Sequence, residues 1–275
     1  MRAMATTTEV KALLGGTSLP PELVDELLDG ATATWLMGER ADTVAADLVL
    51  CHPRLALAEV RAQVFPSSDG GWRLAVATRD RPGLLAAIAG VLATHRLSIT
   101  TGSGTAWPAH DVALMRVTAH PRDDSHGAGP EGQPDDIDWD AIGDDLRSVI
   151  AEGRRVAPTF LHVPDAVIEV MPAGDRTLVT VTCPDRVGLL WAITSWFEDN
   201  DCNIEEASVT SDGEKGVGHF VVTGTVDPGS LTTALTGAAA EPILLASGKW
   251  IVRGIGVGLG ITWGIVRALR KRALG

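Results

Sequence analysis

The feature that most constrains the fold of this chain is a hexapeptide that occurs twice, 105 residues apart. It reads Asp-Arg-Pro-Gly-Leu-Leu at residues 80–85 and Asp-Arg-Val-Gly-Leu-Leu at residues 185–190. The alignment of the two copies continues without a gap as far as Ile99 and Ile204. An internal repeat of this kind indicates two copies of one structural unit.

Each hexapeptide lies between a predicted strand and a predicted helix. Two runs, 72–76 and 178–182, lead into the two copies. Both fit the two-residue period of a strand. After the hexapeptide, apolar residues recur with the spacing of a helix packed on a sheet. They are Leu84, Ile88, Val91 and Leu92 in the first copy and Leu189, Ile193, Trp196 and Phe197 in the second. The hexapeptide is therefore predicted to be a strand-to-helix turn.

A turn of this composition suits a small anion. Gly83 and Gly188 let a backbone or a ligand come close, and the first amide groups of a helix have no partner within it. The carboxylate of an amino acid is such an anion. The structural alternative is that Asp80 and Asp185 cap their helices while the glycines make tight turns. Two copies in the same context predict the fold more strongly than they predict a ligand.

The motif and the strand that follows its helix resemble the ACT domain, a small regulatory module that binds amino acids. That strand opens with Ser98-Ile99 in the first copy and Asn203-Ile204 in the second. The tandem pair resembles the C-terminal sensor region of the bifunctional uridylyltransferase/uridylyl-removing enzymes of nitrogen signalling, over roughly residues 59–240. Pro82 fits the family pattern, whereas Val187 departs from it, and Ser98 stands where an asparagine is usual.

The resemblance implies an α+β fold with two ferredoxin-like domains in tandem. Strands predicted at 60–65 and 167–171 form hairpins with the strands that lead into the motifs, so each unit reads strand, strand, helix, strand, strand, helix. No strand is predicted after the last helix of the second unit. We therefore predict a permuted ββαββα unit, in which the hairpin strand takes the place of the last strand of the βαββαβ arrangement. Pairing of 167–171 with the first unit would contradict this prediction.

Four segments follow from this organisation. They are a helical N-terminal segment (1–58), two ACT-like domains (59–160 and 165–240) and a glycine-rich apolar tail (247–275). Residues 121–137 are rich in Pro, Gly, Asp and Ser and are predicted to be a loop inside the first domain. Asp138 and Asp227 are predicted to cap the last helix of each domain.

The resemblance also implies a set of ligand-binding residues in each copy. They are Asp80, Gly83, Leu84, Leu85, Ser98 and Ile99 in the first copy, and Asp185, Gly188, Leu189, Leu190, Asn203 and Ile204 in the second. We expect the two domains to pair edge to edge and to bind a small amino acid at their interface, with each site drawn from one copy. Glutamine or another amino acid that reports nitrogen status is the ligand implied. Ser98 makes the first site the weaker candidate.

Composition and motifs limit the remaining functions. A net charge of −12 argues against a general nucleic-acid surface. Cys51, Cys183 and Cys202 form no CxxC pair, which favours a reducing, cytoplasmic location. The catalytic domains of the resembling enzymes have no room in residues 1–58. No nucleotide or metal motif occurs, so we expect no enzyme, cofactor or metal, and we interpret His110-Asp111 as a turn and Gly102-Ser103-Gly104 as a bulged strand.

The tail leaves several interpretations open. Between Trp250 and Leu269 the only charges are Arg253 and Arg267; glycines recur every fourth residue, and a basic cluster follows. The uncharged run is shorter than the roughly 20 residues of a membrane span, and its alternation also fits a strand. Membrane contact, a packing or oligomerising segment and disorder are the alternatives. The alternative to amino-acid sensing is a non-sensing scaffold or membrane-associated assembly protein with vestigial sites. Under both functions we expect a homo-oligomer or a partner protein.

Overall fold

The computed structural model describes residues 5–31, 35–36, 39–67, 70–122, 137–160, 162–238, 243–244 and 250–255. The N-terminal segment is helical, as predicted, with helices α1 (Thr7–Leu14), α2 (Pro21–Gly30) and α4 (Ala41–Val49). Helix α1 begins at a capping box, in which Thr6 accepts from the backbone of Glu9 and the Glu9 carboxylate accepts from the backbone of Thr6. Of the loop predicted at 121–137, residues 123–136 lie outside the described residues.

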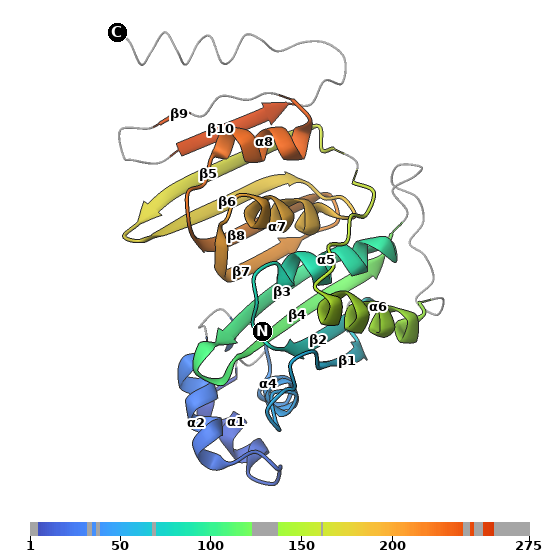
Figure 1. Cartoon of the computed structure of the whole chain (residues 1–275), viewed down its shortest axis with the longest axis vertical. Coiled ribbons are helices and arrows are strands. Elements are labelled where there is room, and N and C mark those ends of the chain that lie inside the picture. Colours follow the sequence, from blue (N-terminus) through green and yellow to red (C-terminus); the bar gives the residue numbers. More distant parts are fainter. Residues whose placement is uncertain are drawn as a thin grey trace.

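The described strands form one ten-stranded sheet in the order β1-β2-β4-β3-β7-β8-β6-β5-β10-β9 (Figure 1). The first unit contains β1 (Val60–Pro66), β2 (Trp72–Thr78), α5 (Leu84–Thr94), β3 (Leu97–Trp107), the single 3₁₀ turn η1 (Pro108–His110), β4 (Val112–Pro121) and α6 (Trp139–Glu152). The second contains β5 (Asp165–Ala173), β6 (Arg176–Pro184), α7 (Leu189–Asp199), β7 (Asn203–Ser211), β8 (Lys215–Thr223) and α8 (Pro228–Thr236).

The permuted arrangement of the units is confirmed. Strand β5 pairs antiparallel with β6 of its own unit, with Val170 opposite Val179, and β1 pairs with β2 in the same way. The hairpin strand therefore lies beside the strand that leads into the motif. The predicted caps are also present, because Asp138 accepts from the Ala141 amide and Asp227 from the Gly229 amide, both at 2.9 Å.

The prediction that no strand follows the last helix of the second unit is wrong. Strand β10 (Trp250–Ile255) pairs antiparallel with β5, and the short strand β9 (Ile243–Leu244) pairs with β10. An alternating run can complete an open sheet edge, because that edge offers unpaired backbone groups. The first six residues of the proposed membrane-contact segment thus belong to the sheet, and its remainder, 256–269, lies outside the described residues. Within the described part of the chain, no helix has the length and apolarity required to cross a bilayer.

The two units join through their edge strands β3 and β7, as the edge-to-edge prediction required. The pairs are Thr101 with Thr210, Gly102 with Val209, and Ser103 with Ser208. Each of these strands has a register shift where it faces its own hairpin partner, between Ile99 and Thr101 and between Ile204 and Glu206. The irregularity of β3 therefore precedes Gly102-Ser103-Gly104, whose residues are regularly paired.

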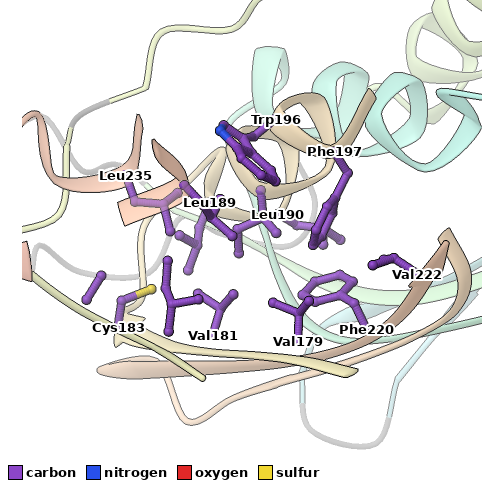
Figure 2. Close-up of a cluster of buried hydrophobic side chains, with 14 of the residues drawn as sticks. Val179, Val181, Cys183, Leu189, Leu190, Trp196, Phe197, Phe220, Val222 and Leu235 are labelled. Atoms are coloured by element: carbon purple, nitrogen blue, oxygen red, sulfur yellow. The ribbon is translucent and has the colours of Figure 1, made fainter. Parts of the chain in front are cut away.

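Helices α5 to α8 cover one face of the sheet and contact one another in the order α6, α5, α7, α8 (Figure 1). Beneath α7 and α8, the side chains of the strands and helices of the second unit close into an apolar core around Phe197 and Phe220 (Figure 2). In the first unit Leu74 and Val76 face the helix side, where they pack with Ile88 and Leu92.

The opposite face of the first unit is covered by the N-terminal helices. Ala75 and Ala77, which alternate with Leu74 and Val76, pack in a separate cluster with residues of α1, α2 and α4. This interface contains a buried charge cluster, in which Asp47 of α4 contacts the guanidinium groups of Arg73 and Arg116. Arg116 also lies over the Trp35 ring, at 4.8 Å from its centroid. The N-terminal segment is thus part of the folded body.

Candidate functional site

Both motifs form the strand-to-helix turn that the sequence predicts. Gly83 and Gly188 adopt left-handed backbone conformations, with φ of 75° and 82°, and helices α5 and α7 begin directly after them. An L-residue with a side chain is strained in this conformation. The glycines are therefore required by the backbone in both copies.

The aspartates of the motifs do not cap these helices. Neither helix has a side-chain cap at its N-terminus. The backbone N–H groups of Leu85 and Ala86, and likewise those of Leu190 and Trp191, have no acceptor among the described residues. Two donors at the start of each helix are therefore available to an anion, where the helix dipole also favours negative charge. The capping alternative for Asp80 and Asp185 is wrong.

Two pockets lie between the units, one at each motif. The first pocket is a cavity of about 220 Å³ lined by residues 80–86 of the first unit together with α7 and the start of β7 in the second. The second pocket is a cavity of only about 30 Å³ between the second motif and β3, with α5, α7, β6, β7 and β8 also contributing to its wall. The first has room for a small organic molecule, whereas the second has room for little more than a water molecule or two.

The pockets bring the predicted residues together in a different grouping from the one expected. Asp80, Gly83, Leu84 and Leu85 share the first pocket with Asn203 and Ile204. Asp185, Gly188, Leu189 and Leu190 share the second with Ile99, while Ser98 contacts Asp185. The expectation that each site is drawn from one copy is therefore wrong. Because β3 and β7 run antiparallel across the junction, each motif faces the strand of the other unit.

This exchange separates the residues that fit the family pattern from those that depart from it. Pro82 and Asn203 both line the first pocket. Ser98 belongs with Asp185 in the second, which also carries the motif containing Val187. Ser98, which the sequence analysis assigned to the first motif's site, therefore lies at the second pocket.

Asp185 accepts hydrogen bonds from at least three donors among the described residues. The guanidinium Nη1 of Arg122 lies 2.9 Å from its Oδ2 atom, and the hydroxyl groups of Ser211 and Ser98 donate to the same atom at 2.8 and 3.2 Å. Asp185 is 6% exposed. Arg122 and Ser98 come from the first unit and Ser211 from the second, so this cluster links the two units across the junction.

The first pocket is strongly acidic. Its wall includes Asp80, Glu198, Asp201 and Glu205 but only one basic residue, Arg81. Glu198 lies against the Gly83 turn and contacts Arg155 at 3.5 Å, and Glu205 pairs with Arg176 at 2.8 Å. Desolvation raises the pKa of the Asp80 carboxyl. A positively charged group is therefore favoured beside the free amides of α5.

Sequence reasoning missed Glu198, Asp201, Arg122 and Ser211. The repeat itself contained part of the signal, because Glu198 corresponds to Ala93 and Asn203 to Ser98 in the other copy. Near the second motif, Ala93 accordingly lies beside Gly188 where Glu198 lies beside Gly83. Arg122 gave no signal, since it lies outside the gapless part of the alignment.

No cluster of three or more metal-binding side chains occurs in the described part of the chain. His110 ends the short 3₁₀ turn before β4 and contacts Glu26 at 2.9 Å, while Asp111 pairs with Arg79. The His-Asp pair is thus a turn, as predicted. Cys51, Cys183 and Cys202 are buried free thiols, and burial raises the pKa of Cys183 to about 12.

Comparison with known proteins agrees with this architecture. Residues 177–239, which contain β6, α7, β7, β8 and α8, match the ACT domain family. The chain is 30% identical over 190 residues to the bifunctional uridylyltransferase/uridylyl-removing enzyme of Streptomyces coelicolor, covering 63% of this chain and 22% of that enzyme. For the enzyme of the same name from Gluconobacter oxydans the identity is 27% over 219 residues, covering 74% and 23%. For that from Nitrobacter winogradskyi it is 30% over 199 residues, covering 67% and 21%.

The chain spans about a fifth of the length of these curated relatives. The second unit matches the ACT family directly, and the first repeats its motif, strand order and turn geometry. The chain therefore folds as a tandem pair of ferredoxin-like units, of which the second matches the ACT domain family, and it is similar to part of the bifunctional uridylyltransferase/uridylyl-removing enzymes.

Proposed function

We propose that this protein is a regulatory module that binds one free amino acid in the first pocket. The observation that carries the proposal is the convergence of Asp80, Gly83 and Leu84 with Asn203 and Ile204 around a cavity of about 220 Å³. The second pocket is too small for such a ligand, and its aspartate is already bonded. One ligand for each chain is therefore expected.

The pocket offers complementary groups to the two charges of an amino acid. The N–H groups of Leu85 and Ala86 can donate to the α-carboxylate, and carboxylates of the wall can accept from the ammonium group. Glu198 is the nearest of these to the Gly83 turn. Asn203 can then donate to or accept from a polar side chain of the ligand. Glutamine, which the resemblance suggested, fits these requirements.

The position of the pocket supports a regulatory role. A bound amino acid would contact α5 of the first unit and both α7 and β7 of the second, so it would stabilise the junction. A partner protein or a second copy that binds at the junction would then respond to whether the pocket is occupied. The proposal assigns the module a cytoplasmic location and a binding role rather than a catalytic one; the region matched is about a fifth of the length of the curated relatives.

Thermal unfolding of the full-length protein in the presence of each of the twenty standard amino acids tests the proposal. A ligand at a hundredfold excess over its Kd should add about 2.7 kcal/mol to the free energy of unfolding. A selective, dose-dependent rise in Tm is expected for one or a few amino acids. Equal Tm values with all twenty would contradict amino-acid sensing and favour the scaffold alternative.

A further inference from the structure

We propose that the second pocket is a latent amino-acid site, held closed by Arg122, whose guanidinium group occupies the position of a ligand's ammonium group. This inference rests on the proposed function of the first pocket, because the two pockets are built from the same motif. In this proposal Arg122 occupies the ammonium position of the second pocket and so limits the protein to one bound ligand.

The contacts of Asp185 support the assignment. Its Oδ2 atom receives Arg122, Ser98 and Ser211 at 2.8 to 3.2 Å. The cationic donor among them is Arg122, and an ammonium group would supply the same charge and the same kind of donor. In the first pocket Asp80 accepts from the backbone of its neighbour Arg81 and has no ion-pair partner among the described residues. The cation position is thus filled in one pocket and open in the other.

The anion half of the second pocket remains intact. Gly188 keeps the left-handed turn, and the N–H groups of Leu190 and Trp191 have no acceptor in the described ranges. A methyl group added to Gly188 would meet Phe160, Ala93 and the Thr159 carbonyl at ordinary contact distances of 3.6 Å or more. This pocket therefore differs from the first in its small volume, in its bonded aspartate, and in having Ala93 and Ser98 where the first has Glu198 and Asn203.

Arg122 is placed by the first unit and has no equivalent in the second. It follows β4 directly, and its backbone N–H donates to the Arg96 carbonyl at 2.9 Å. The hairpin pairs of Ile99 with Ala119 and of Ile204 with Val222 show that Thr225 holds the corresponding position. The first pocket therefore cannot be closed by the same device, and Arg122 adds to the differences between Glu198 and Ala93 and between Asn203 and Ser98 that break the pseudo-symmetry of the two sites.

Equilibrium dialysis of the full-length protein against each of the twenty standard amino acids, radiolabelled one at a time, measures the number of bound molecules. The wild type should bind one molecule and Arg122→Ala should bind two. Arg122→Ala combined with Asp185→Asn should return to one, which would locate the second molecule beside Asp185. Arg154→Ala is the matched control, because Arg154 is an exposed arginine paired with Glu152 away from both pockets, and it should bind one.

Binding at the first pocket shows that each variant is folded, and Arg122→Gln, which keeps most of the side-chain stem, provides a second variant. Two molecules bound to the wild type, or one bound to folded Arg122→Ala and Arg122→Gln, would contradict the closure of the second pocket by Arg122. Binding by Arg122→Ala without binding by the wild type would contradict the proposed function of the first pocket and still support closure of the second by Arg122. An absence of binding by every variant would overturn both.

Discussion

Ser103 of β3 lies directly opposite Ser208 of β7, and these two residues hold the same position in the two copies of the repeat. A pseudo-two-fold axis therefore passes between them. On either side of this axis, each motif lies beside the strand of the other unit. This relationship makes each pocket a composite of both units, and it explains why residues adjacent in one copy are separated between two sites.

The first prediction concerns Asn203. Replacing Asn203 with Ala should remove ligand-linked stabilisation, a loss of about 2.7 kcal/mol at a hundredfold excess of ligand, because Asn203 lines the open pocket. The measurement is Tm with and without the amino acid that stabilises the wild type. Ser98→Ala, at the equivalent position of the other copy, is the control and should keep the ligand response. A response lost in Ser98→Ala and kept in Asn203→Ala would place the ligand in the second pocket.

The second prediction concerns the charge of the ligand. Because four carboxylates and one guanidinium line the first pocket, glutamate and aspartate should bind more weakly than glutamine and asparagine. Calorimetric titration of the full-length protein compares the two members of each pair. Glu198→Gln should narrow the difference, whereas Glu152→Gln, an exposed residue outside the pocket, should not. Tighter binding of glutamate than of glutamine would contradict the proposed role of the acidic wall.

The third prediction concerns the left-handed glycines. Gly83→Ala should cost about 1–2 kcal/mol in the free energy of unfolding, because alanine is strained at positive φ. Its methyl group would also meet the Glu198 carboxylate at 2.5 Å and so displace it, which should weaken ligand binding. Urea unfolding and calorimetric titration measure the two effects.

Gly174→Ala is the control that separates backbone strain from displacement of the Glu198 carboxylate. Gly174 has a φ of 71° in the β5–β6 turn, and no atom lies within 4 Å of the added methyl group. This variant should show the loss of stability without the loss of affinity. Full ligand affinity in a folded Gly83→Ala protein would contradict a site at the Gly83 turn.

The fourth prediction concerns the buried cluster beneath the N-terminal helices. Burial raises the pKa of Asp47 to about 6, and the guanidinium of Arg73 offsets this effect only in part. The folded state therefore holds the proton of Asp47 to a higher pH than the unfolded state does. The contribution of Asp47 to stability should fall as the pH rises from about 4 to about 6 and stay constant above, by an amount on the order of 3 kcal/mol.

Urea unfolding of the wild type and Asp47→Asn across this range isolates the effect. The difference in free energy of unfolding, wild type minus variant, should decrease with pH because asparagine does not titrate. Asp42→Asn is the control on the same helix. Contact with Arg40 lowers the pKa of the exposed Asp42, so the difference in free energy of unfolding between the wild type and this variant should not decrease with pH. A difference that grows with pH for Asp47→Asn would show that the guanidinium groups control its ionisation.

The sequence by itself determined the local structure of each unit. The repeat, the alternating runs and the apolar stripes depend on neighbours close in the chain, so they predicted the hairpins, the helix beginnings at Gly83 and Gly188 and the caps at Asp138 and Asp227. The permuted strand order also followed, because the hairpins were visible before each motif. Edge-to-edge pairing followed from the resemblance.

Only the tertiary structure decided which halves of the sites meet. The antiparallel register of β3 with β7 joins residues far apart in the chain, and no local pattern encodes it. The same holds for Arg122 on Asp185, for Glu198 beside Gly83 and for β10 on the edge of β5. These contacts form only when distant parts of the chain are placed side by side. Both units contribute residues to the pockets at the junction, so neither unit alone determines the volume or the charge of a pocket.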